Sequence, residues 1–146
     1  AEDIMKSAKE NIEQQKYDEA VKLFEKLVIE FPENDLAPVA LYETATIYQN
    51  RLFKNISEKE SLTKAASLFK EVYDKYPASN EAAKSLFFAG FIKANELREY
   101  NEATELYSLF IEKFPQHELA ASAKAELDNM GIPAEDIIKN DSVTEK

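Results

Sequence analysis

The sequence predicts an all-α fold, an α-solenoid built from repeated helix hairpins, on the strength of three observations. Segments 17–32, 62–77 and 100–115 align without gaps, and each ends in an aromatic residue followed by proline. Within each segment the apolar residues recur at the three- and four-residue spacing of one helix face. Only two glycines occur in 146 residues, which disfavours the tight turns of β-hairpins and phosphate loops.

The segment at 17–32 shows the pattern that the other two repeat. Its closing residue, Pro32, cannot continue a helix and biases the preceding residue toward extended geometry. Each segment is therefore predicted to be a helix that ends at its proline. The apolar stripe of this first segment consists of Ala20, Leu23, Phe24, Leu27, Val28 and Phe31.

A second amphipathic stretch precedes each of these segments, and the three stretches align through Ala8, Ala45 and Gly90. Small residues at this column let two helices approach closely. The unit is therefore a helix hairpin of about 34 residues, with repeats predicted at 2–32, 35–77 and 79–115. The second repeat is longer, and its excess, at 51–61, is predicted to be a surface insertion.

After Pro115 the chain begins another first-type helix, but no partner helix follows it. Polar residues replace apolar ones in its latter half, as expected of a terminal cap that is solvated on its free face. A capping helix is predicted at 117–131, with Gly131 as its stop. The repeat domain then covers 1–131 as a right-handed stack of three hairpins and a cap, and 132–146 is predicted to be a short turn and flexible tail.

Charge and composition argue against several classes of function. The formal charge of −10 disfavours nucleic-acid binding and adsorption to an anionic membrane surface. The absence of cysteine removes disulfides, thiolate nucleophiles and thiolate metal sites. No apolar run approaches the ~20 residues of a membrane span, so direct membrane insertion is not predicted. No cofactor or metal site is predicted either.

His117 is the only histidine in the chain. In the repeat alignment it occupies the position of Asn34 and Ser79, just before a first-type helix, where side chains accept hydrogen bonds from free amides. Histidine is a poorer cap than those residues, so this site is interpreted as a structural joint with a weak helix start. The alternative, a hydrolase that uses His117 and nearby carboxylates, is the least favoured hypothesis.

The repeats resemble a known family at this level of detail. Ala8, Ala20, Phe24 and Pro32 match the tetratricopeptide repeat consensus, as do Ala65, Phe69 and Pro77 in the second unit. The resemblance covers residues 2–131. Its "YP" and "FP" endings, and the stretch at 82–127, resemble the divergent branch found in the Tol-Pal coordinator proteins YbgF/CpoB and in BamD-like outer-membrane lipoproteins.

The resemblance implies that the first helices of the hairpins line a concave groove that binds a peptide or a partner domain. Aromatic and amide side chains there suit an amphipathic helix or an extended segment. The alternative is that a neighbouring helix, or the insertion with Leu52, Phe53 and Ile56, covers some of these rings. The predicted partner-binding residues are Met5, Lys9, Tyr42, Thr46, Gln49, Phe87, Phe91 and Asn95.

The favoured functional hypothesis is a non-catalytic scaffold for protein–protein interaction in bacterial envelope maintenance or outer-membrane protein assembly. By resemblance, its location is the periplasm, with attachment to the outer membrane through a segment preceding Ala1 as one variant and the cytoplasm as the alternative. The second hypothesis is a structural module that self-associates through the insertion or a terminal helix, giving a homo-oligomer. No nucleic-acid partner is expected.

Overall fold

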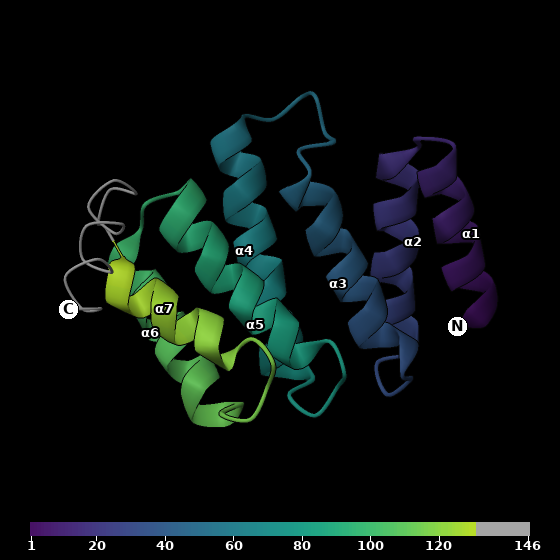
Figure 1. Cartoon of the computed structure of the whole chain (residues 1–146). Coiled ribbons are helices and arrows are strands. Elements are labelled where there is room, and N and C mark those ends of the chain that lie inside the picture. Colours follow the sequence, from purple (N-terminus) through teal and green to yellow (C-terminus); the bar gives the residue numbers. More distant parts are fainter. Residues whose placement is uncertain (131–146) are drawn as a thin grey trace, which may run out of the picture.

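The computed structural model of the chain describes residues 1–130, and in that part it contains seven α-helices, one π-helix and no strand. The helices follow one another along the molecule in chain order, from α1 at one end to α7 near the other (Figure 1). The all-α repeat solenoid predicted from the sequence is confirmed. The elements are α1 (Glu2–Glu13), α2 (Tyr17–Glu30), α3 (Leu36–Gln49), α4 (Glu58–Lys75), α5 (Ala82–Phe91), η1 (Ile92–Glu96), α6 (Tyr100–Lys113) and α7 (Ala120–Asn129).

Neighbours in sequence are neighbours in space. Each helix packs mainly on the helices before and after it, and α1 also contacts α3. The hairpins are α1 with α2, α3 with α4, and α5 plus η1 with α6, whereas α7 has no following partner among residues 1–130 and packs on α6. The predicted turn and tail at 132–146, and the stop at Gly131, lie outside the described residues.

The proline positions end the second helices as predicted. Helices α2, α4 and α6 end at the residue before the aromatic residue of each aromatic–proline pair. The three turns that follow are alike. The backbone N–H groups of Asn34, Ser79 and His117 donate to the carbonyls three residues earlier, at 3.1, 3.0 and 3.1 Å. A proline that cannot continue the helix, followed by one fixed turn, gives every hairpin the same exit geometry.

The column of small residues brings the two helices of a hairpin close together. Ala8 and Ala45 are fully buried, and Gly90 faces the ring of Tyr107 on α6 so closely that a Cβ at Gly90 would lie 3.1 Å from ring carbons. The first two repeats have phenylalanine where the third has Tyr107. The third hairpin thus combines the smallest residue of the column with the largest ring.

The connection between α3 and α4 differs in part from the predicted surface insertion at 51–61. Helix α4 already begins at Glu58, so the extra residues divide between a loop and the first turn of that helix. The Ser57 hydroxyl accepts a hydrogen bond from the Glu60 N–H at 3.1 Å, and the Ser61 hydroxyl donates to the Tyr48 carbonyl at 2.6 Å. These bonds satisfy the start of α4 and tie it to the end of α3.

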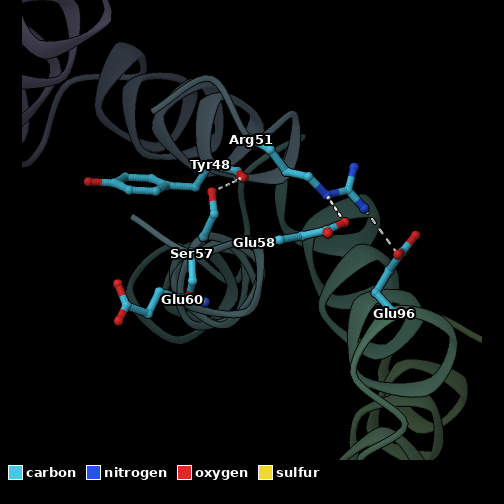
Figure 2. A network of polar contacts seen from close by, with 7 residues as sticks. Tyr48, Arg51, Ser57, Glu58, Glu60 and Glu96 are labelled. Atoms are coloured by element: carbon cyan, nitrogen blue, oxygen red, sulfur yellow. Dashed lines mark hydrogen bonds and ion pairs between the residues drawn. The ribbon is translucent and has the colours of Figure 1, made fainter. Parts of the chain in front are cut away.

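Arg51 fixes this loop to both the second and the third hairpin. Its guanidinium pairs with Glu58 at 2.7 Å and with Glu96, at the end of η1, at 3.1 Å (Figure 2). Phe53 packs on Tyr48, with ring centroids 4.8 Å apart. Leu52 and Phe53 are half-buried against the core cluster formed by α1, α2 and α3, so these two apolar residues of the loop cover that cluster instead of forming a free surface.

Three residues other than glycine adopt left-handed backbone geometry. They are Gln15, Arg51 and Arg98, with φ of 60°, 57° and 55°. Each lies in the turn between the two helices of one hairpin, so the repeat requires this conformation even though glycine is absent there. The strain is about 1–2 kcal/mol for an L-residue. The scarcity of glycine in the sequence therefore disfavours β-hairpins, but it does not exclude left-handed residues in these helix–helix turns.

Replacing Gln15 with glycine is expected to stabilise the chain by about 0.5–1 kcal/mol, because relief of left-handed strain exceeds the entropy cost of glycine. Urea denaturation measures the change. Arg51→Gly is the matched comparison, and it should gain less because it also loses the pairing with Glu58 and Glu96. A lower unfolding midpoint for Gln15→Gly would contradict the strain argument.

Gly90→Val is expected to lower the free energy of unfolding by about 1–3 kcal/mol, because its side chain overlaps the Tyr107 ring in a packed interior. Thermal and urea unfolding report the loss. Ser108→Val, at an exposed position of α6, controls for adding valine to a helix. Equal stability of the two variants would show that the close approach at Gly90 is not required.

Candidate partner-binding surface

The first helices of the hairpins, α1, α3 and α5, present a surface that is called the first-helix face below. Its centre is Tyr42 on α3, which is half-buried. The Lys84 ammonium of α5 lies 4.4 Å from the centre of the Tyr42 ring, within the range of a cation–π interaction. The rings of Phe69 and Phe88 lie 5.5 and 6.5 Å from it. An aromatic ring and a cation are thus held together across two repeats.

The surroundings of Tyr42 raise the pKa of its hydroxyl. Burial raises the pKa of its hydroxyl above the ordinary value, and the nearby carboxylate of Glu43 adds to the rise. One turn further along α3, the Thr46 hydroxyl donates to the Tyr42 carbonyl at 3.1 Å. Gln49 follows at the end of the helix and is half-buried. The predicted residues of α3 therefore do lie along one helix face.

Phe87 and Met5 are buried, so little of either side chain is accessible to a partner. Phe87 is 8% exposed and packs edge-on against Phe88, Tyr107 and Phe110, at centroid distances of 6.1, 5.6 and 5.9 Å. The expectation that its ring lines the groove needs correction, because α6 covers it. Met5 is 6% exposed. Phe91 is half-buried.

Asn95 lies in η1 and is exposed. Its amide donates to the Glu126 carboxylate of α7 at 3.1 Å, and more weakly to the Phe91 carbonyl at 3.4 Å. The π-helix itself was not predicted. It is defined by bonds such as Leu97 N–H to the Ile92 carbonyl at 2.9 Å, and π-segments occur frequently at functional sites. Asn95 links the third hairpin to the cap, so a partner would have to compete with Glu126 for its amide.

A separate groove of about 520 Å³ runs along α1 to the start of α3. Met5 and Lys9 both line it, together with Leu36 of α3. Lys9 is exposed. Met5 and Lys9 therefore lie together at the N-terminal end of the stack, apart from Tyr42 on α3 and from Asn95, which contacts the cap.

The sequence reasoning missed Lys84 and Phe88, which complete the surroundings of Tyr42. Lys84 lies three residues before Phe87, one turn back on α5, so it shares the helix face that was considered. Reading that face for charged as well as aromatic residues would have found it. Phe88 had no such signal, because its position depends on how α5 packs on α4.

His117 is a structural residue. Its Nδ1 atom accepts a hydrogen bond from the Leu119 N–H at 3.0 Å, just as the Asn34 side chain accepts from the Leu36 N–H at 2.9 Å. This assigns the ring proton to Nε2. The ring also packs edge-on against Phe110, at 5.5 Å. These contacts support the interpretation of this segment as a structural joint, with a hydrogen bond equivalent to that of Asn34.

These observations define the chain as an α-helical repeat protein. Residues 5–34, which comprise most of the first hairpin, match the family model of the tetratricopeptide repeat. The match supports the tetratricopeptide repeat family, and the other two hairpins align with the first through the columns given above. Such repeats generally mediate protein–protein interaction and are generally non-catalytic scaffolds. No curated protein matches the chain.

Two further properties follow from residues 1–130. None of the helices in this part is both long and apolar enough to cross a membrane. Over the same residues, no group of three or more histidine, aspartate or glutamate side chains is arranged to hold a metal ion.

His117→Leu is expected to cost about 0.5–1.5 kcal/mol of stability, because the Leu119 N–H loses its acceptor while apolar packing is kept. His117→Asn should cost less, since asparagine makes the equivalent bond in the first turn of this kind, at Asn34. Chemical denaturation distinguishes the two variants. If both lose the same stability, the hydrogen bond from Leu119 contributes nothing measurable.

Proposed function

We propose that the chain is a scaffold that binds a peptide segment or partner domain on its first-helix face, centred on Tyr42 and Lys84. The observation that carries the proposal is the Lys84 ammonium 4.4 Å from the centre of a half-buried Tyr42 ring. Tyrosine supplies a large, rigid contact area, and such residues dominate the energy of many interfaces. The ammonium adds a directed charge at the same place.

The arrangement suits a partner that offers an apolar side chain beside a carboxylate. The apolar group would pack on Tyr42, and the carboxylate would pair with Lys84. Gln49, at the end of α3, provides an amide that bonds partner backbone. An amphipathic helix or an extended peptide presents such groups at regular intervals.

The proposed setting is the bacterial periplasm, in envelope maintenance or outer-membrane protein assembly. Support comes from the resemblance of the repeats, with their aromatic–proline endings, to envelope tetratricopeptide proteins. Fractionation of cells that express the complete natural gene tests this setting. Recovery of the protein in the cytoplasmic fraction alone would refute it.

Self-association through the insertion is less well supported, because Leu52 and Phe53 pack against the core cluster of α1, α2 and α3. Sedimentation at several protein concentrations distinguishes the two functions. A monomer agrees with a free first-helix face, whereas a concentration-independent dimer favours the oligomerisation module.

Substitution of the central residues tests the binding surface. Partners are first captured from a periplasmic extract and identified, and the affinity of the purified partner is then measured. Tyr42→Ala and Lys84→Glu are each expected to weaken binding at least about tenfold, since central interface residues contribute more than about 1.4 kcal/mol.

Lys113→Glu is the matched control, because it reverses the same charge at an exposed position of α6. It should leave the affinity unchanged. Circular dichroism checks that helicity is kept in every variant. Unchanged affinity in Tyr42→Ala and Lys84→Glu would exclude this surface.

A further inference from the structure

A second groove, distinct from the first-helix face, lies between the second helices α4 and α6. It has a volume of about 770 Å³ and is called the α4–α6 groove below. On α4 it is lined by Thr63, Ala66 and Ser67, which recur at helical spacing. On α6 it is lined by Leu106 and Leu109. Thr63 and Ser67 on the α4 wall are small and exposed, whereas on the α6 wall Leu106 is buried in the core and Leu109 is half-buried.

The π-helix η1 packs against both α4 and α6, and its Lys93 lines the groove. Lys93 is held by an ion pair with Glu99 at 2.5 Å and is only 20% exposed. The π-helix at 92–96 therefore contributes Lys93 to the wall of the α4–α6 groove.

The charges of the groove do not balance. Lys70 pairs with Asp74 at 2.5 Å, and Glu71 pairs with Lys75 at 2.6 Å. With Lys93 also paired, every lysine that lines the groove already has a carboxylate partner.

Glu102 and Glu105 of α6 also line the groove, and neither makes an ion pair within residues 1–130. Both are exposed. Glu102 lies in the first turn of α6, where a carboxylate also stabilises the helix. Glu105 lies beyond that turn and has no basic residue four positions away in either direction. Two carboxylates without an ion-pair partner in residues 1–130 thus lie on the same wall of the groove as the half-buried Leu109.

We propose that the α4–α6 groove binds a basic amphipathic segment of a partner protein. Its apolar side chains pack against Leu109, the half-buried leucine of the groove, and its lysine or arginine residues pair with Glu102 and Glu105. A volume of about 770 Å³ lies in the range of specific binding clefts and accommodates several side chains. Tyr42 is not among the residues that line the α4–α6 groove.

The charge of the groove favours a basic partner segment over the segment 131–146, a second copy of the chain or a nucleic acid. The segment 131–146 contains four acidic and two basic residues, so it does not complement Glu102 and Glu105. A second copy of the chain carries a formal charge of −10, and like charges across an interface are unfavourable. A nucleic acid is excluded by the same sign.

The test uses the full chain and a defined probe. The probe is a fluorescently labelled amphipathic peptide of lysine and leucine, about four helical turns long, with the leucines on one face. Its control replaces every lysine with glutamate. Fluorescence anisotropy should show saturable binding of the basic peptide, weakened as salt is raised, and no binding of the acidic peptide.

The double variant Glu102→Lys/Glu105→Lys should reduce affinity for the basic peptide at least tenfold and create measurable binding of the acidic one. Glu30→Lys/Glu33→Lys is the matched control, because it makes the same net charge change at exposed positions outside the groove. Ser67→Trp, which fills the groove from an exposed position, should also abolish binding.

Two results would overturn the proposal. An equal loss of affinity in both double variants would show attraction to overall charge without a site. Loss of binding in Tyr42→Ala, with Ser67→Trp unaffected, would place the basic segment on the first-helix face. Because Tyr42→Ala is also the variant that tests the proposed function, the two sites can fail separately.

Discussion

The structure depends on the close approach of the two helices within each hairpin. A small residue of the first helix, Ala8, Ala45 or Gly90, lies fully buried or against the aromatic ring of the second helix. This contact sets the separation of the helices, and the aromatic–proline end of each second helix sets where the next hairpin begins. Repetition of one contact and one turn is sufficient to build the stack, since each unit packs only on its neighbours.

The sequence contained enough information for the fold because the hairpin contacts are local and recur. Phe24, Phe69 and Tyr107 occupy one column of the aligned segments, and all three rings are fully buried. The change from α-helix to π-helix after Phe91, in the first helix of the third repeat, was not predictable in the same way. Its π-segment, Ile92–Glu96, has ordinary helix-forming residues, and only packing against α4 and α6 distinguishes it from a continued α-helix.

The candidate site was harder to predict than the fold. Helical periodicity placed Tyr42, Thr46 and Gln49 on one face, but it could not show that α6 would cover Phe87. Nor could it show that Lys84 would reach across to Tyr42 from the next repeat. Exposure and cross-repeat pairing depend on the angle between successive hairpins. No single-helix pattern encodes that angle.

The core is divided into two clusters that meet at α3. Ala37, Ala40 and Ile47 of α3 pack with α1 and α2, whereas Leu41 and Ala45 pack with the helices that follow. Such a division allows the molecule to open in parts, because the first hairpin can detach while the larger cluster stays intact. Hydrogen exchange would then be faster in α1 and α2 than in α4 to α6. A ligand on Lys9 would slow exchange in the first hairpin alone, whereas one at Tyr42 would protect the larger body.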